Sequence, residues 1–188
     1  QPNWGHKVMG NDFRLVNDST IQGTYYTKGW AEHHQLSYTI RLASPVDSIA
    51  LYRDGKRELI QPGYAVTKDT ADLKLHLYLP AGSEAYQVKI GVSAVSPEGA
   101  EKNLTAELPH WDFDAVHQES RRIWSEVLSR ITIETKDTTV LKNFYTAVYH
   151  AHIAPYNYQD VDGAFRGMDK QIHQGDPKDG HYTVFSIW

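Results

Sequence analysis

The chain has 188 residues, which is long enough for one sizeable hydrophobic core or for one domain with part of another. Its 19 basic residues are outnumbered by 23 acidic ones, so the net charge of -4 gives no electrostatic reason to expect nucleic acid as a partner. No apolar run approaches the length that spans a bilayer, and the absence of cysteine excludes thiol catalysis, thiolate metal sites and disulfide bonds.

Three segments of the first half alternate apolar and polar residues with the period of a β-strand. They are LSYTIRL, DLKLHLYL and VKIGVSAV. Each places every second side chain on one face, as a strand buried on one side does. Strands with one polar face are typical of antiparallel sheets. The residues expected to form the buried faces are Leu36, Tyr38, Ile40, Leu42, Leu73, Leu75, Leu77, Leu79, Val88, Ile90, Val92 and Ala94.

Turn residues separate these segments at short intervals. Asp54-Gly55 stands between two strand-like runs and predicts a two-residue hairpin turn, because glycine tolerates a positive φ. Further turns are predicted at Pro62-Gly63, Pro80-Ala81-Gly82 and Pro97-Glu98-Gly99. Short strands separated by such regular turns predict an antiparallel β-sandwich or part of one.

After Pro109 the apolar residues recur every three or four positions, which is the period of a helix. A first helical pattern covers residues 113–131. A second helix is expected at about residues 138–153, with Asp137 or Thr138 as its N-cap.

Pro155 is expected to end this second helix, because proline cannot continue one. The change of period predicts a β-sandwich module over residues 1–109, a linker helix over 110–135 and the start of a helical domain over 136–188. The predicted fold class is therefore α+β, with part of an antiparallel sandwich followed by helices.

Aromatic residues gather in the segment YYTKGWAEHHQLSY. Gly29 and Trp30 follow a strand-like run, at a loop where an indole can offer a flat platform for the C–H face of a sugar. Core packing is the alternative for Trp30, since tryptophan is well buried in most proteins. The neighbouring His33 and His34 are not expected to bind one metal ion, because adjacent side chains of a strand point to opposite faces.

The segment QDVDGAFRGMDK carries Asp160, Asp162 and Asp169. Counted from the first of these, it lacks the acidic residues that a calcium loop of the EF-hand type needs at its fifth and twelfth places. The preferred interpretation is a structural turn, in which aspartates cap backbone N–H groups while Gly163 and Gly167 adopt unusual φ angles.

The ends of the sequence lack the features of natural termini. The chain begins without an initiator methionine or a signal peptide, and it closes on the apolar run YTVFSIW without a turn or a helix cap. We therefore expect it to be a piece of a longer protein.

The second half resembles the start of the catalytic region of glycoside hydrolase family 92, the calcium-dependent exo-acting α-mannosidases. The similar segments are NFYTAVYHAHIAP, DVDGAFRGMD and YTVFSIW. They correspond to the family patterns FYTALYH followed by proline, D-x-DG-x-YRG-x-D, and FSLWDTFR. Val148, Phe165 and Ile187 replace the more common Leu, Tyr and Leu, and these exchanges keep the packing class. Upstream, GTYYTKGWAEHHQLSY is similar to the family segment that ends in GWA.

This resemblance implies an N-terminal β-sandwich packed against an (α/α)6 barrel, with both lining a sugar pocket. It implies inverting hydrolysis of terminal α-linked mannose, in which a carboxylic acid protonates the leaving oxygen and a carboxylate activates water. The acid and base of the family lie downstream of the FSLW pattern, so no residue of this chain is expected to be catalytic. The chain alone is not expected to hydrolyse mannosides. Ca2+ is expected as the cofactor of the full enzyme, with most of its ligands outside this chain.

The resemblance also selects substrate-binding candidates, which are Trp30, Gly29, Arg166, Gly167 and Asp169. The expected partners are mannose-containing glycans, with α-1,2 linkages preferred, and the remainder of the catalytic domain. The expected location is periplasmic or extracellular in a bacterium, without membrane insertion. The alternatives are a non-catalytic carbohydrate-binding β-sandwich module and a scaffold segment whose loop only joins sandwich to barrel.

Overall fold

The computed structural model describes residues 5–29, 31–82 and 85–183, and within them it contains ten strands and three helices. The strands are β1 (Lys7–Asn17), β2 (Thr20–Lys28), β3 (His34–Leu42), β4 (Ser48–Arg53), β5 (Lys56–Ile60), β6 (Ala65–Asp69), β7 (Leu73–Tyr78), β8 (Val88–Ser93), β9 (Ala164–Arg166) and β10 (Ile172–Gln174). The helices are α1 (Pro97–Glu107), α2 (Phe113–Leu128) and α3 (Thr138–Ala151).

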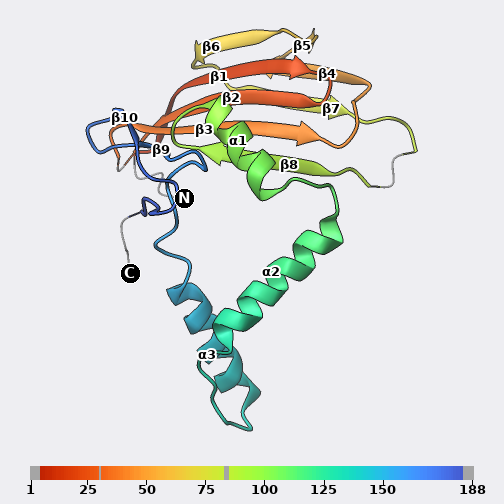
Figure 1. The fold of residues 1–188 in the computed structure, drawn as a ribbon. Coiled ribbons are helices and arrows are strands. Elements are labelled where there is room, and N and C mark those ends of the chain that lie inside the picture. The colour runs from red at the N-terminus through yellow and green to blue at the C-terminus, as the bar shows by residue number, and fades with distance from the viewer. Residues whose placement is uncertain (1–4, 30, 83–84, 184–188) are drawn as a thin grey trace.

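Two antiparallel sheets face each other and form a sandwich (Figure 1). The larger sheet has the strand order β6-β1-β2-β3-β8, and the smaller has the order β5-β4-β7. Their facing sides enclose the hydrophobic core, which confirms the predicted antiparallel sandwich. The buried core residues are Phe13, Leu15, Ile21, Leu42, Val46, Ile49, Leu51 and Ile60.

The hairpin of β4 and β5 turns at Asp54 and Gly55, as predicted. These residues have φ angles of 48° and 80°, and Arg53 pairs with Lys56 across the turn. Two consecutive positive φ values are the geometry of a type I′ turn, whose twist matches that of the flanking strands.

The apolar face predicted for β8 is exposed, which corrects the sequence-based prediction. Val88, Ile90 and Val92 are 49%, 57% and 50% exposed, and the described residues of the smaller sheet do not cover them. The alternate residues Gly91 and Ser93 are buried instead, because α1 packs on the other face of β8. The leucines of β7 pack against the core as predicted. The predicted core residues that are exposed are Leu36, Leu79, Val88, Ile90 and Val92.

Helix α1 is an element that the sequence analysis missed. The segment Pro97-Glu98-Gly99, predicted as a turn, forms the first turn of this helix. Ser96 is the N-cap, and its Oγ accepts a hydrogen bond from the N–H of Gly99 (3.0 Å). Proline suits the first helical position because no N–H is required there, so such residues begin turns and helices alike. The helix lies close to β8 at Gly91, where an added Cβ would overlap the carbonyl of Ala100.

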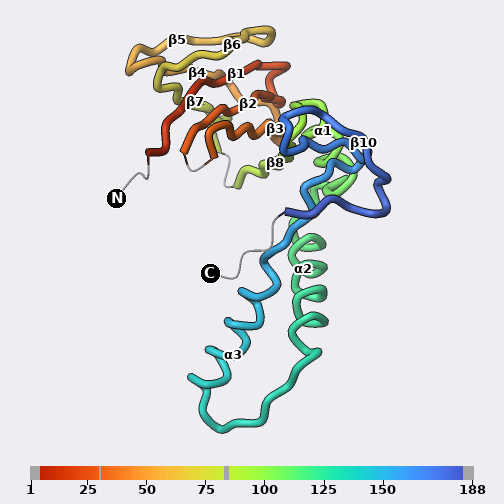
Figure 2. The backbone as a smooth tube through the Cα atoms, turned by 90° about the vertical axis from the view of Figure 1, so that its left-hand side faces the viewer, coloured from red at the N-terminus to blue at the C-terminus, as the bar shows by residue number. Residues whose placement is uncertain are grey.

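Helices α2 and α3 form a pair that extends away from the sandwich (Figure 2). Both were predicted, and the carboxylates of Asp112 and Asp137 cap their N-termini. The rings of Trp124 and Tyr149 meet between the two helices, with centroids 4.6 Å apart. None of the described residues of either helix is buried. Helix α3 ends at Ala151, slightly before the predicted end.

After α3 the chain returns to the sandwich (Figures 1 and 2). There, β9 and β10 form a small hairpin near α1 and the end of β8, and Asn157 pairs with Tyr182 in an isolated bridge. We call residues 156–183 the returning segment. The proposed domain division near residue 109 falls between α1 and α2 and stays a prediction. Among the described residues, no helix is both long and apolar enough to cross a membrane.

Candidate functional site

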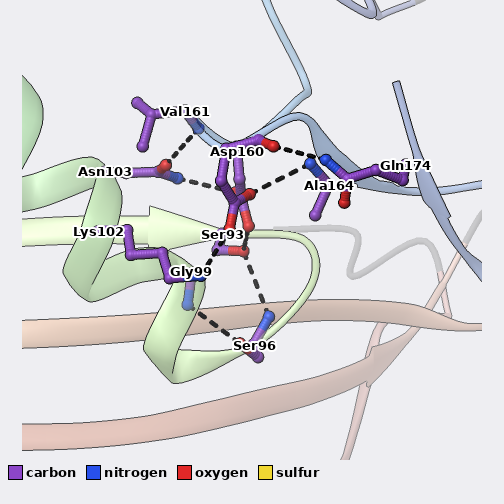
Figure 3. A network of polar contacts seen from close by, with 10 residues as sticks. Ser93, Ser96, Gly99, Lys102, Asn103, Asp160, Val161, Ala164 and Gln174 are labelled. Carbon is purple, nitrogen blue, oxygen red and sulfur yellow. Dashed lines mark hydrogen bonds and ion pairs between the residues drawn. The ribbon is translucent and has the colours of Figure 1, made fainter. Parts of the chain in front are cut away.

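A buried aspartate attaches the returning segment to the sandwich (Figure 3). Asp160 is 3% exposed. Its Oδ2 accepts a hydrogen bond from Ser93 Oγ (2.7 Å), and its Oδ1 accepts one from Asn103 Nδ2 (2.8 Å). Gly99 leaves the space for this carboxylate, because an added Cβ would overlap Asp160 Oδ2. The carboxylate therefore joins the end of β8, helix α1 and the returning segment.

Asp162 holds the turn that follows. Its carboxylate pairs with Lys102 Nζ (2.6 Å) and accepts a hydrogen bond from the N–H of Ala164 (3.2 Å). The hydrogen bond from Lys102, and then that from the backbone, lower the pKa of the Asp162 carboxyl. Gly163 has a φ of 91°, as the turn requires. These contacts confirm the interpretation of this loop as a structural turn, as far as the cap by Asp162 and the positive φ of Gly163 are concerned.

Three backbone carbonyls accept hydrogen bonds from Arg166. Its Nε donates to Ala94 O (2.9 Å), its Nη1 to Lys170 O (3.0 Å) and its Nη2 to Val95 O (3.4 Å). The first and third of these carbonyls lie just beyond β8, so the guanidinium joins the β9–β10 hairpin to the edge of the larger sheet. These hydrogen bonds support the hairpin, and the positive charge of Arg166 lies beside a cleft.

A cleft of about 590 Å³ opens between the β2–β3 end of the sandwich and the returning segment. It brings Arg166 next to the loop that joins β2 to β3, which the sequence analysis proposed as a sugar-facing loop. Its residues come from four separate parts of the chain, so the cleft exists only in the folded protein. The residues that line it are Met9, Tyr26, Thr27, Lys28, Glu32, His33, His34, Gln35, Lys68, Tyr158, Arg166 and Lys170.

Tyr26 and Asp12 form a polar pair at the base of the β2 wall. The hydroxyl of Tyr26 donates to Asp12 Oδ2 (2.6 Å), and Asp12 Oδ1 accepts from the N–H of Lys68 (2.7 Å). Burial, and then the hydrogen bond to the Asp12 carboxylate, raise the pKa of the Tyr26 hydroxyl, while the charge of Arg166 opposes this rise. Asp12 thus ties two residues of the cleft wall together.

Of the other predicted sugar-binding residues, Gly29 flanks the cleft and Trp30 lies outside the described residues. Gly29 is in the loop after β2, where its N–H donates to Ala31 O (2.9 Å). The proposed stacking of a sugar on Trp30 therefore stays a prediction.

Gly167 and Asp169 are absent from the described lining of the cleft. Asp169 is exposed, accepts a hydrogen bond from the N–H of Gln171 (3.0 Å) and pairs with His173 Nε2 (2.9 Å). The hydrogen bond from His173, and then that from Gln171, lower the pKa of the Asp169 carboxyl. Gly167 does not have the unusual φ that we predicted. A Cβ at this position would meet the side-chain ends of Asp169 and His173 in their present positions. Both residues shape the hairpin turn next to the cleft.

The described residues do not assemble a calcium site. Among them, no group of three or more His, Asp or Glu side chains could hold a metal ion. Asp160 and Asp162 are already engaged by hydrogen bonds and an ion pair, and His34 Nδ1 lies 3.3 Å from Thr27 Oγ1. This part of the chain therefore does not fit such a site by itself.

The lysines of the cleft were not among the predicted site residues, whereas Arg166 was. Lys28 lies in the aromatic segment YYTKGWAEHHQLSY, and Lys170 lies in the aspartate-containing segment QDVDGAFRGMDK. The positive charge of these two residues could have marked them as candidates. Lys68 and Tyr158 gave no signal, because only the folded chain brings them to this cleft.

Comparisons with known proteins agree on one family. The model of the glycosyl hydrolase family 92 catalytic domain matches residues 99–188. The structure of the family GH92 α-mannosidase BT3965 from Bacteroides thetaiotaomicron matches with 29% identity and a TM-score of 0.85, covering 97% of this chain and 25% of that chain. The structure of the same enzyme with mannoimidazole matches with a TM-score of 0.84. A comparison with curated proteins found no match.

A more distant solved structure supports the fold alone. The inverting mannosidase BT2199 from Bacteroides thetaiotaomicron has 20% identity and a TM-score of 0.76, over 94% of this chain and 24% of that chain. The present chain thus spans about a quarter of the length of the solved structures that it matches.

Proposed function

We propose that this chain is part of a glycosyl hydrolase family 92 enzyme, and that it forms the sandwich side and the first helices of an exo-α-mannosidase. The observation that carries the proposal is the match to the α-mannosidase BT3965, with a TM-score of 0.85 at 29% identity over 97% of the chain. The complex of that enzyme with mannoimidazole supports mannose-containing glycans as the ligands.

The proposed reaction is hydrolysis of terminal α-linked mannose with inversion, with α-1,2 linkages preferred. An inverting glycosidase needs a carboxylic acid that protonates the leaving oxygen and a carboxylate that activates water on the opposite face. We place both carboxylates outside residues 1–188, which correspond to a quarter of the length of the related enzymes. The residues of this chain would then bind and orient the sugar.

The cleft is the proposed contribution of this chain to sugar binding. It offers hydroxyl and ring donors from Tyr158, Thr27 and His33 beside the loop that carries Gly29 and Trp30. An exposed indole there would give a sugar an apolar platform, and the polar groups would fix its orientation.

Calcium is proposed as the cofactor of the full enzyme, with ligands from residues outside the described ones. The protein is proposed to be periplasmic or extracellular.

The coding sequence and an activity assay test this proposal together. If the reading frame continues past Trp188, it should resume with Asp-Thr-Phe-Arg and later supply paired carboxylates. The continued polypeptide is expected to release mannose from α-1,2-mannobiose, with β-mannose as the first product seen by proton NMR, and to lose activity when a chelator is added. The 188-residue chain alone is expected to be inactive. Release of α-mannose first, or no release from any mannobiose, would contradict the proposal.

A binding experiment on the 188-residue chain distinguishes an enzyme part from an independent binding module. The chain has five tryptophans, so mannose binding can be followed by their fluorescence. Saturable binding at low millimolar mannose would favour the module, whereas an enzyme that needs the rest of its pocket should show little or no change.

A further inference from the structure

The cleft between β2–β3 and the returning segment is positively charged, although the whole chain is acidic. Four of its lining residues are cations, and Glu32 is the one carboxylate among the described lining residues. The chain as a whole has a net charge of -4. A neighbouring cleft of about 360 Å³ along β8 has no lysine or arginine among its described lining residues. Of these two clefts, the one between β2–β3 and the returning segment is the one whose described lining includes lysine and arginine. Its cations are Lys28, Lys68, Arg166 and Lys170.

The three lysines of this cleft have no ion-pair partner within the described parts of the chain. The ion pairs found there involve other cations, including Lys74 with Asp72 and Lys102 with Asp162. Arg166 gives its hydrogen bonds to carbonyls, which are neutral, and forms no ion pair within the described parts of the chain. The carboxylate of Asp12, which accepts from Tyr26 and from the N–H of Lys68, offsets part of the positive charge at this wall. Like charges gathered in a cleft repel one another unless a counter-ion is bound.

Two of these lysines have a positive φ angle, a backbone conformation that glycine adopts more easily than other residues. The φ angles of Lys68 and Lys170 are 47° and 68°, and Asp54 is the other residue besides glycine with a positive φ in the described chain. Asp54 belongs to a hairpin turn in which aspartate is common. Lys170 lies in the turn of the β9–β10 hairpin, and Lys68 lies where the pairing of β6 with β1 shifts its register. Both positions therefore have a local use for a positive φ, and lysine stands at each although glycine would adopt this conformation more easily. Residues kept in an unfavourable backbone conformation often serve a functional site.

Hydrogen bonds fix both strained lysines to the walls of the cleft. The N–H of Lys68 donates to Asp12, which also accepts from the Tyr26 hydroxyl. The carbonyl of Lys170 accepts from Arg166 Nη1, and its N–H donates to the carbonyl of Gly167 (2.9 Å). The backbone at each lysine is thus held in place, while the side chain remains exposed and able to reach a ligand.

We propose that this cleft binds an oxyanion substituent, a phosphate or a sulfate, carried by a carbohydrate ligand. The ammonium groups of Lys28, Lys68 and Lys170 neutralise the anion, and the charge of Arg166 adds to the attraction. Thr27 and Tyr158 supply hydroxyl groups at the same walls. A cleft of about 590 Å³ admits a sugar together with its anionic group. The carbohydrate part rests on the proposed function, whereas the oxyanion part rests on the cleft alone.

Calorimetric titration of the 188-residue chain at low salt tests the proposal with four probes: mannose, mannose 6-phosphate, mannose 6-sulfate and inorganic phosphate. We expect each charged sugar to bind at least about tenfold more tightly than mannose, and the advantage to shrink at high salt. Inorganic phosphate is expected to compete with both. Equal affinity for mannose and the charged sugars would overturn the oxyanion site and leave the proposed function standing. Binding of inorganic phosphate without any sugar preference would overturn the carbohydrate part, and no binding of any anion would overturn the whole proposal.

Variants connect the binding to the named lysines. The double variant K68Q/K170Q is expected to lose at least about tenfold in affinity for mannose 6-phosphate. The control K56Q/K142Q removes two exposed lysines elsewhere and is expected to bind normally. An equal loss in both variants would show a non-specific charge effect and refute the site.

Glycine variants separate charge from structure. In K68G and K170G the backbone conformation becomes easy to adopt, so thermal stability is expected to stay or rise while anion binding falls. A lower melting temperature with unchanged binding would show that the lysines serve packing, and it would refute the proposal.

Discussion

At the scale of single residues, the side chain of Asp160 connects three parts of the fold. A buried carboxylate is costly unless its oxygens receive hydrogen bonds. Here Ser93 and Asn103 supply one donor to each oxygen. Removal of the carboxylate would leave these two donors without their acceptor, so the effect should exceed that of losing an exposed ion pair.

The substitution Asp160→Ala is therefore expected to lower the free energy of unfolding by about 2–4 kcal/mol. The matched control is Asp162→Asn, which weakens the more exposed pair with Lys102 and is expected to cost less than about 1 kcal/mol. Urea denaturation of both variants measures the difference. Equal midpoints for the two variants would contradict the role assigned to Asp160.

At the scale of secondary-structure elements, the close approach of α1 to β8 depends on Gly91. An added Cβ there would overlap the carbonyl of Ala100 and the side chain of Leu104. Both partners belong to a helix whose buried residues include Ala100 and Leu104 themselves, so they have little freedom to move. The distance between α1 and β8 therefore depends on the absence of a Cβ atom at Gly91.

We expect Gly91→Ala to destabilise the protein by about 1–3 kcal/mol, because the helix must shift away from the sheet. Gly175→Ala is the control, since a Cβ at that position meets its neighbours at ordinary contact distances of 3.5 Å or more. Thermal unfolding followed by circular dichroism compares the two variants. A stable Gly91→Ala protein beside a destabilised Gly175→Ala protein would reverse this expectation.

The local sequence pattern predicted most of the helices and strands. The errors share one physical cause, which is that burial and helix formation depend on contacts with other elements of the fold. The turn at Asp54-Gly55 and the N-cap at Asp137 follow from the preferences of the residues themselves. The burial of β8 does not, because it depends on which element lies on each face. Val88, Ile90 and Val92 alternate as a buried strand would, yet α1 covers the other face. Likewise, Pro97 suits both a turn and a helix start, and its surroundings decide between them.

At the scale of the whole molecule, the sandwich and the α2–α3 pair differ in how they are held. The sandwich encloses a core with several residues that are almost fully buried, such as Leu15 and Ile21. None of the described residues of α2 or α3 is buried. Helices of this length are marginal in water without packing partners, so their hydrogen bonds should open more easily.

Hydrogen–deuterium exchange is expected to show this difference directly. Amides of α2 and α3 should exchange at least about tenfold faster than those of β2 and β3. Exchange of both helices at the rate of the sheet would contradict this prediction and would show that the pair is covered in solution, for instance by association of two chains.

The candidate site was predicted in part. The sequence indicated the loop with Gly29 and the hairpin with Arg166, and the cleft has Arg166 in its wall and Gly29 beside it. It could not give the position of Lys68, since that residue reaches the cleft through the pairing of β6 with β1. It also could not show that the guanidinium of Arg166 is already engaged by carbonyls. Such contacts arise only when distant segments meet.

The separate origins of the two cleft walls have a consequence during synthesis on the ribosome. The wall from β2 and β3 emerges early, whereas the wall from the β9–β10 hairpin emerges only after both long helices have been made. Until then the sheet edge beyond β8 lacks the guanidinium that later occupies its carbonyls. The nascent sandwich would therefore lack one wall of the cleft until the β9–β10 hairpin has been made, and ligand recognition would be acquired late.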